Sequence, residues 1–338
     1  MRVVTFGEVL LRFSSPARLR LTQTGVMNAN YGGSEANAAV SLAMLGNEVR
    51  YVTRLPRNTM GEACVERLRE MGLDTRHICW GGQRIGSYFF EQAASLRSPR
   101  MVYDRKDSAF YTLQPGMIPW REVFRNVDVF HCSGITCALS QSAADATFEA
   151  VRIADEMGLT IACDINYRKN LWNYGAEAAD VLPRLVHYAS VVFGDAGEWE
   201  LVSRLPRIPF KAERSDYTID VEAYTDMFCK IADRYPRCRK FILGLRNEPS
   251  TNRHLLSGVL FNRERLFTTK IYDINPVIDP MGVGDAYLAA YLHAYLNRCG
   301  DDQHCLDFSL AASALKSTIS GDFNLSTEDE VLELMADD

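Results

Sequence analysis

The sequence predicts an α/β fold with a mostly parallel sheet, formed as one domain over residues 1–338. Between residues 125 and 300, short apolar runs typical of buried strands alternate with longer helical patterns. This order is the one that parallel strands with crossover helices require. The composition, with 47% hydrophobic and 24% charged residues, is that of a globular protein with ample material for a core. No repeat, low-complexity tract or linker divides the chain.

The individual elements follow from periodicity. An extended apolar run over residues 3–7 is followed by a second extended piece over residues 9–13, and a helix after residue 35 ends at Gly46. Further strands are expected over residues 49–53, 127–132, 159–164, 190–193, 240–245, 258–260 and 267–272. Further helices are expected over residues 61–71, 140–157 and 221–235, whereas the polar insertion 204–220 has no assignment.

A second kind of pattern interrupts the first helical region. Residues 86–90 and 101–105 read as short extended pieces without helices between them. We expect them to form a small β substructure that projects from the main sheet. Tyr103 and Arg105 have the same parity, so they should share one face of their strand.

Charge and cysteine content exclude several classes of protein. The formal net charge of −6 argues against nucleic acid or an anionic membrane as the main partner. The N-terminal apolar run is too short for a signal peptide, and no segment has the apolar length of a membrane span. Nine scattered cysteines form no C-x-x-C pair, and the group Cys299, His304 and Cys305 matches no zinc spacing. A cytoplasmic protein with buried thiols is expected.

The octapeptide over residues 278–285, IDPMGVGD, carries the most suggestive chemistry. It precedes a helical pattern, so Gly282 and Gly284 lie where a loop becomes a helix. Glycines there let backbone N–H groups approach a ligand closely, and a helix N-terminus favours an anion. Asp285 would oppose a bound anion unless it accepts a proton from a hydroxyl during phosphoryl transfer. One hypothesis is therefore a kinase with Asp285 as its base.

The same octapeptide has a second interpretation of similar weight, which is a glycine turn followed by a capping aspartate. Two other motifs are excluded. The dinucleotide pattern G-x-G-x-x-G fails because Tyr287 occupies the last glycine position, and no G-x-x-x-x-G-K-[ST] loop occurs anywhere.

A second glycine motif, GGSEAN over residues 32–37, also precedes a helix. Gly33 would again allow close approach of the backbone to a small molecule, and Asn37 in the first turn could donate to or accept from it. Taken alone, a simple turn with Ser34 as the helix cap is the more common arrangement.

Polar groups follow several of the expected parallel strands. They are Asp164 to Arg168, Asp195 with Glu198, and Arg246 with Asn247. Because ligands bind at the carboxyl ends of strands in such sheets, we expect these groups at a ligand site.

With both glycine motifs placed, the chain resembles the ribokinase-like sugar kinases of the phosphofructokinase-B family. Residues 32–46 resemble the first signature of that family and residues 279–290 the second, in the right order and about 250 residues apart. The resemblance covers essentially the whole chain. It implies a three-layer sandwich with a mostly parallel sheet, and a β lid over the sugar formed by roughly residues 10–30 and 84–113.

Within the family, the chain is most similar to the 2-keto-3-deoxygluconate kinases. The stretches that carry this similarity are residues 103–105, 131–136, 164–169 and 314–324. The resemblance implies that Asp285 deprotonates the 6-hydroxyl and that Gly282, Val283 and Gly284 form the anion hole. It also implies substrate contacts from Gly33, Asn37, Tyr88, Tyr103, Arg105, Asn166 and Arg168. Mg²⁺ would be served by Asp195 and Glu198, and the ATP nucleotide by Arg246, Ala311 and Asn324.

The arginines support an acidic sugar independently. Arg12, Arg105 and Arg168 all lie on elements expected to line the sugar pocket, and arginine binds a carboxylate through paired, charge-assisted hydrogen bonds. The competing interpretation is that one or more of them, Arg12 above all, forms a surface ion pair.

Two positions depart from the pattern of the family. Asp195 replaces the asparagine usual in the family, and Val283 replaces the more common alanine.

Three functions stay open at this point. The first is an ATP-dependent 2-keto-3-deoxygluconate kinase, the second a fructokinase or other ketose kinase, and the third a catalytically silent sugar- or nucleotide-binding regulator; an oxidoreductase is a distant fourth. The resemblance implies ATP and Mg²⁺, leaves a monovalent cation such as K⁺ open, and suggests a homo-oligomer formed through the lid.

Overall fold

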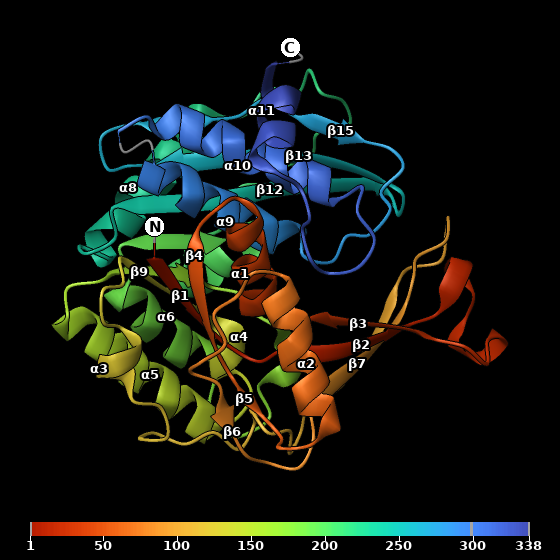
Figure 1. Cartoon of the computed structure of the whole chain (residues 1–338). Coiled ribbons are helices and arrows are strands. Elements are labelled where there is room, and N and C mark those ends of the chain that lie inside the picture. The colour runs from red at the N-terminus through yellow and green to blue at the C-terminus, as the bar shows by residue number, and fades with distance from the viewer. Residues whose placement is uncertain (1, 298–299, 337–338) are drawn as a thin grey trace.

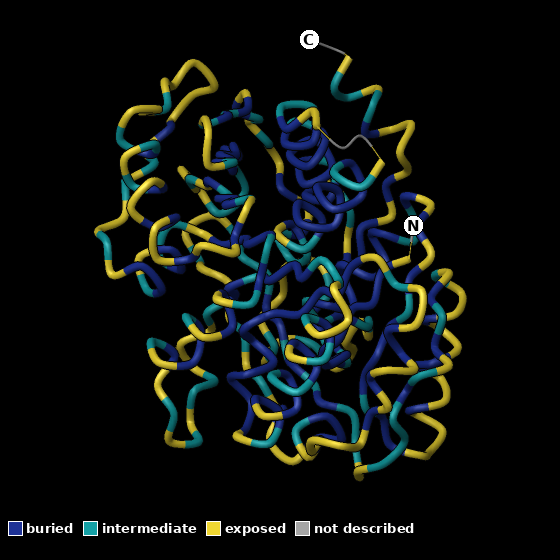
Figure 2. The backbone as a smooth tube through the Cα atoms, turned by 90° about the vertical axis from the view of Figure 1, so that its left-hand side faces the viewer, coloured by how far each residue is buried: buried dark blue, intermediate teal, exposed yellow. Residues whose placement is uncertain are grey.

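The structure is a computed structural model that describes residues 2–297 and 300–336. A central sheet runs through the molecule with helices on both faces, and a separate group of strands projects from one side (Figure 1). Figure 2 shows that buried residues follow the strands and the inner faces of the helices, while exposed residues mark the loops. The three-layer α/β arrangement expected from the sequence is confirmed.

The main sheet has nine strands, in the order β14-β13-β12-β11-β10-β9-β1-β4, with β15 paired to β13. The six strands from β12 to β4 are mutually parallel. Their bounds are β1 Arg2–Phe6, β4 Glu48–Val52, β9 Val129–Ser133, β10 Thr160–Asp164, β11 Val191–Gly194 and β12 Lys240–Ser250. Every strand expected by periodicity in this region is present, within a few residues at its ends.

The antiparallel edge departs from the expected alternation. β12 and β13 (Arg253–Phe261) pair antiparallel with no helix between them. The expected strand over residues 267–272 is divided into β14 (Leu266–Thr268) and β15 (Tyr272–Ile274). The Thr269 hydroxyl accepts from Gly258 N–H at 2.9 Å and the Thr269 N–H donates to the Gly258 carbonyl at 3.1 Å, so the chain stays attached to β13 between the two pieces.

Two apolar clusters hold the layers together. One joins one face of the sheet to α3, α4, α5, α6, α7 and α8, and the other joins the opposite face to α1, α2, α9, α10 and α11. The first set spans Trp120–Val123, Gly134–Cys137, Gln141–Glu156, Ala178–Tyr188, Ala196–Ser203 and Val221–Arg234. The second spans Ser34–Met44, Thr59–Glu70, Val283–Asn297, Asp302–Lys316 and Glu328–Ala336. Short 3₁₀ turns occur at Pro16–Arg18, Leu21–Gln23 and Lys169–Leu171.

The projecting strands form a four-stranded sheet in the order β3-β2-β7-β8. Its members are β2 Leu10–Ser14, β3 Asn28–Gly32, β7 Gly86–Glu91 and β8 Arg100–Asp104. We call this sheet the lid. A third, two-stranded sheet joins β5 (Arg54–Leu55) to β6 (Cys79–Trp80).

The unassigned insertion 204–220 is a loop between α7 and α8 with neither helix nor strand. Phe210 and Ala212 pack with Leu255 and Ile271, and the Asn247 side chain donates to the Ala212 carbonyl at 2.8 Å.

Among the described residues no helix has the length and apolarity needed to cross a membrane. Free thiols are found at Cys64, Cys79, Cys132, Cys137, Cys163, Cys229 and Cys238, and Cys299 lies outside the described residues.

Candidate active site

The polar groups expected at strand ends meet the N-terminus of α9 beneath the lid. Asp164 ends β10, Asp195 follows the neighbouring strand β11, and Ser133 ends β9 on the other side of β10. Parallel strands present their carboxyl ends along one edge, which explains why residues distant in sequence meet here.

Asp285 is the centre of this site. Its Oδ1 accepts a hydrogen bond from the Ser34 hydroxyl at 2.7 Å and its Oδ2 accepts from the Asn37 side chain at 2.8 Å. The Asn166 side chain donates to the Ser34 hydroxyl at 2.8 Å and to Asp164 at 3.0 Å. Burial raises the pKa of Asp285, although the bonds from Asn37 and Ser34 lower it in part. The two glycine motifs of the sequence therefore converge on one carboxylate.

The loop before α9 has the geometry of an anion hole. Gly282 has a φ of +79°, and a Cβ atom there would lie 2.0 Å from the Asp322 carbonyl oxygen, so only glycine fits. The Ala286 N–H donates to the Gly282 carbonyl at 2.9 Å, which leaves the N–H groups of Val283 and Gly284 ahead of the first helical bond. A Cβ at Gly284 would meet nothing within 4 Å, so a ligand can approach the backbone there.

Gly33, at the start of α1, is likewise a position that only glycine can occupy. Its φ is +140°, and a Cβ there would lie 2.2 Å from the Glu8 carbonyl oxygen. The alternative assignment of Ser34 as helix cap is wrong, because Gly33 holds the N-cap position and the Ser34 side chain turns to Asp285 instead.

Two buried side-chain amide oxygens close to Asp285 have no partner among the described residues. They are Asn37 Oδ1 and Asn166 Oδ1, on the same side chains whose NH₂ groups support the Asp285 cluster. Asn166 also has a φ of +41°, a strained conformation that asparagine tolerates better than most residues. Unpaired buried acceptors are costly, so these atoms are suited to accepting hydrogen bonds from a ligand's hydroxyl groups.

Arg168 follows β10, and its side chain makes no hydrogen bond or ion pair within the part of the chain that the structure describes. Partial desolvation lowers its pKa, but the charges of Glu198, Tyr103, Asp164 and Asp285 outweigh this and raise it. An exposed cation with no partner of its own, close to Asp285, is available for an anionic ligand.

Arg105 is buried just after β8. Its Nε donates to Glu8 Oε2 at 2.7 Å, while its Nη1 has no partner among the described atoms. Its guanidinium lies 5.8 Å from the centre of the Tyr103 ring, and that ring lies 5.9 Å from the Tyr88 ring. The expected set Tyr88, Tyr103 and Arg105 is thus brought together on the inner side of the lid.

Arg12 overturns the alternative of a surface ion pair. It is 1% exposed and bonds to Asp279 and Asp322, each at 2.8 Å. The Tyr88 hydroxyl also donates to Asp322. Burial lowers the pKa of Arg12, but the two carboxylates outweigh it and raise the pKa. Arg12 therefore links the lid to the loop that carries the anion hole.

Comparison with known proteins agrees with this geometry. A model of the pfkB family of carbohydrate kinases matches residues 1–216, which is more than half of the chain. The chain is a pfkB-family carbohydrate kinase.

Solved and curated relatives extend over nearly the full kinase. The crystal structure of a 2-dehydro-3-deoxygluconokinase from Thermotoga maritima superposes with a TM-score of 0.91 at 34% identity, covering 99% of both chains. A 2-dehydro-3-deoxygalactonokinase of Haloferax volcanii is 28% identical over 97% of this chain and 95% of its own. A 5-dehydro-2-deoxygluconokinase of Clostridium botulinum is 26% identical over 93% of this chain and 86% of its own.

Asp195 and Glu198, the residues expected to serve a metal in the kinase, form a capping box at the start of α7. Glu198 N–H donates to Asp195 Oδ1 and Asp195 N–H donates to Glu198 Oε2, both at 2.8 Å. Tyr167 N–H donates to the other Glu198 oxygen at 2.7 Å. Burial and the charge of Asp195 raise the pKa of Glu198 to about 7. Among the described residues no group of three or more His, Cys, Asp or Glu side chains forms a direct metal cage.

Two of the three residues expected to contact the nucleotide are buried. Asn324 is 1% exposed, donating to Ser41 at 3.2 Å and accepting from Ser326, and Ala311 has no exposed surface in α10. Both residues are covered by protein in this conformation, and their contact with a nucleotide stays a prediction. Arg246 is exposed but lies within β12 and not at its end, and it pairs with Glu248 at 3.1 Å.

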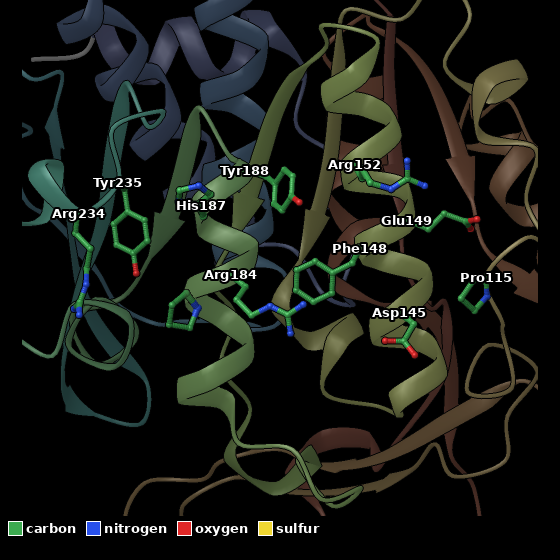
Figure 3. A pocket seen from close by; sticks show the side chains of 11 residues that line it. Pro115, Asp145, Phe148, Glu149, Arg152, Arg184, His187, Tyr188, Arg234 and Tyr235 are labelled. Carbon is green, nitrogen blue, oxygen red and sulfur yellow. The ribbon is translucent and has the colours of Figure 1, made fainter.

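The structure also has a hollow of about 750 Å³ between α5 and α6 (Figure 3). Its lining includes Phe148, Arg152, Arg184 and His187. None of the residues predicted for the site lines it, and the guanidinium of Arg184 lies over the Phe148 ring at 4.6 Å. This hollow is separate from the Asp285 cluster.

Sequence reasoning missed three residues that the structure brings into the site: Ser34, Glu8 and Asp322. Ser34 carried a competing signal as a cap, and Glu8 and Asp322 carried none, because their partners Arg105 and Arg12 are about 100 and 310 residues away. Their burial, 2% and 4% exposed, becomes meaningful only with the fold in hand.

Proposed function

We propose that this kinase transfers the γ-phosphoryl group of ATP to the 6-hydroxyl of 2-keto-3-deoxygluconate. In this step Asp285 accepts the hydroxyl proton, the sugar oxygen forms a bond to the γ-phosphorus, and the bond to the bridging oxygen breaks to release ADP. The raised pKa of Asp285 makes it a stronger proton acceptor than an exposed aspartate. Backbone N–H groups of residues 282–284 would stabilise the charge on the transferring group.

The observation that carries the substrate assignment is the unpartnered cation of Arg168 close to Asp285. A neutral sugar would leave this guanidinium without a direct ion-pair partner, whereas a sugar acid supplies a carboxylate for it. The spare Nη1 of Arg105 is a second donor, and the free oxygens of Asn37 and Asn166 would accept from the sugar hydroxyls. The names of the relatives, which all denote kinases of dehydro-deoxy gluconate or galactonate, support the same class of substrate.

Mg²⁺ fits the acidic group at the ends of β10 and β11. Asp195 is exposed, and one of its oxygens is free of the capping box, while the buried Glu198 and the half-buried Asp164 interact electrostatically with each other. Because Mg²⁺ keeps most of its water, Asp195 and Glu198 would hold it through water molecules. When bound, the ion would neutralise phosphate charge that Asp195 would otherwise repel.

The test is a coupled assay of ADP release with Mg·ATP against 2-keto-3-deoxygluconate, 2-keto-3-deoxygalactonate, gluconate, fructose and ribose. Selective turnover of the two keto-deoxy acids is expected. Preference for fructose or ribose would discard the acid pocket and favour the ketose kinase. Absence of turnover with every sugar would favour the silent regulator.

A further inference from the structure

Lys316 is a buried charge that lies in the stretch 314–324 but has no role in the proposed mechanism. It ends α10 and is 0% exposed, whereas every other lysine in the described residues is partly or fully exposed. Burying an ammonium group is costly unless its charge is needed or compensated. Its position therefore calls for a function.

The side chain lies directly behind the anion hole. A Cβ added to Gly282 would lie 3.3 Å from Lys316 Cε, and Lys316 Nζ donates to the Ile319 carbonyl at 2.9 Å. The next residue, Ser317, accepts from the N–H groups of Ile278 and Asp279 at 2.8 and 3.3 Å. The end of α10 is thus attached to the loop that forms the hole.

One turn earlier, α10 also contacts the start of α9. The Ser313 hydroxyl donates to the Val283 carbonyl at 3.0 Å. These contacts fix Lys316 relative to the N–H groups of the anion hole. An ammonium group has three donors, and the structure records one of them in use.

The charges around Lys316 come from four elements. Arg12 lies on β2, Asp279 in the anion-hole loop, Asp285 on α9, and Asp322 in the segment after α10. Arg12 pairs with both Asp279 and Asp322, which leaves one negative charge in excess when these three groups are ionised. Lys316 offsets that charge, so Asp285 is the remaining anion of the group. Without it, a negatively charged phosphoryl group would enter beside uncompensated carboxylates.

We propose that Lys316 supplies a fixed positive charge behind the anion hole, which offsets Asp279 and Asp322 and thereby stabilises the transferring phosphoryl group. Lys316 acts through the electrostatic field of the site and not as the proton acceptor, which remains Asp285. The inference rests on the proposed phosphoryl transfer, but it concerns the ATP side of the reaction and is independent of which sugar is accepted.

The titration of Lys316 gives a measurable signature. Burial lowers its pKa to about 8, although Asp279 and Asp322 raise it in part. The kcat/KM for ATP should therefore fall as the pH rises through about 8, because the free enzyme loses this charge.

The effect of this titration on stability has the opposite sign. Between about 8 and the ordinary value of 10.5 the unfolded chain binds more protons, so this group makes the fold more stable as pH rises. Loss of activity through Lys316 is therefore distinguishable from unfolding.

The decisive variant is Lys316→Met, which keeps the length of the side chain and removes its charge. We expect at least a tenfold loss of kcat/KM for ATP and disappearance of the fall near pH 8. By calorimetry, affinity for Mg·ATP should weaken at least fivefold while affinity for Mg·ADP changes less than twofold. Lys240→Met is the matched control, since Lys240 is a partly buried lysine that pairs with Asp302 at the other end of α10; it should keep both affinities and the pH profile.

A Lys316→Met protein with wild-type kcat/KM and an unchanged pH profile would overturn the proposal. If this variant does not fold, Lys316→Arg decides the question, because it keeps a charge that stays protonated: the fall near pH 8 should move to higher pH, and an unmoved fall overturns the proposal. Failure of the wild-type kinase to phosphorylate any sugar would sink the proposed function alone. The difference between ATP and ADP affinities would still test Lys316.

Discussion

Asp285 combines partial burial with two donors that hold its carboxylate in one orientation. Ser34 and Asn37 each donate to a different oxygen, so a sugar hydroxyl must approach along a remaining lone pair. A fixed orientation is useful for a general base, because the base must lie within hydrogen-bond reach of the proton that it removes. Its pKa matters only once that geometry is in place. At the scale of single residues, the site is built around this one orientation.

Replacing this base tests the mechanism. Asp285→Asn should retain sugar and ATP binding but lower kcat by about 10²–10⁴-fold, the usual contribution of general base catalysis. Steady-state ADP release, with ligand binding measured by calorimetry, separates the two effects. Asp307→Asn on α10 is a suitable control, because Asp307 is a partly buried aspartate that accepts from Gln303 at 3.0 Å away from the site. Normal turnover of Asp285→Asn would contradict its role as base.

Replacing Arg168 tests whether the pocket binds the carboxylate of a sugar acid. Removing a charge-assisted contact is worth about 1.5–3 kcal/mol, so Arg168→Ala should reduce kcat/KM for the keto-deoxy acid by roughly 10- to 100-fold. Any slow turnover of fructose should change little, since fructose has no carboxylate. Arg207→Ala, which removes an arginine that is 65% exposed on its side chain, serves as the control. Equal losses for both sugars would remove the argument for a sugar acid.

Glu35 gives a prediction about stability and pH. It is 1% exposed and accepts from Ser133 at 2.6 Å and Thr136 at 2.8 Å, yet burial raises its pKa to about 7. The folded state therefore binds the proton more tightly than the unfolded state does, and stability falls as pH rises from about 4.5 to 7. Glu35→Gln should flatten this part of the stability curve in urea titrations at several pH values. Glu70→Gln, whose side chain is 64% exposed, should leave the curve unchanged.

At the scale of elements, the loop before α9 is held from three directions. Arg12 reaches it from the lid, Ser317 from the end of α10, and the Asp322 carbonyl packs against Gly282. Asp279 accepts from Arg12 and also from the N–H groups of Met281 and Gly321, at 3.1 and 3.0 Å. The loop proposed to form the anion hole is therefore preorganised by elements far apart in the sequence.

Gly282→Ala tests this packing. A side chain in the left-handed region costs about 1–2 kcal/mol by itself. At Gly282 the added Cβ also meets the Asp322 carbonyl at 2.0 Å. Gly46→Ala is the matched control, because Gly46 has a φ of +85° but nothing within 4 Å of an added Cβ. Denaturant titrations should show a larger loss for Gly282→Ala, accompanied by loss of turnover; equal losses would mean that the contact with Asp322 is not restrictive.

At the scale of the whole molecule, the outer face of the lid is apolar and uncovered. Ala29, Phe13, Phe89 and Val102 lie in register across its four strands, opposite the inward face that carries Arg12. The Phe13 and Phe89 rings stack at 5.5 Å, and Val102 is 56% exposed. A sheet with such a face and two open edges is suited to pairing with a second copy.

We therefore expect a homo-oligomer that forms through the lid. Light scattering after size exclusion should give at least twice the monomer mass of 38.1 kDa. Val102→Glu should shift the protein towards the monomer by placing a charge in the interface. Val221→Glu, at a site 48% exposed on α8, should leave the mass unchanged. A monomeric wild-type protein at micromolar concentration would contradict the proposal.

The sequence by itself determined the α/β class, the succession of strands and helices along the chain and the two glycine motifs, and it singled out Asp285 as the candidate base. These features are local. Periodicity reports which face of an element is buried, and a glycine before a helix reports a turn that other residues cannot adopt. Asp285 and Gly282 could be identified as candidates because the motif that contains both spans only the eight residues 278–285.

Only the tertiary structure decided which charges are partners. Arg12 looked like a ligand or a surface residue until the fold placed it between Asp279 and Asp322, and Lys316 had no assigned role until its burial behind Gly282 was known. The antiparallel edge and the turn of Ser34 away from its helix were likewise decided by packing. Electrostatic partnership depends on distances between segments up to 310 residues apart, and no local pattern encodes those distances.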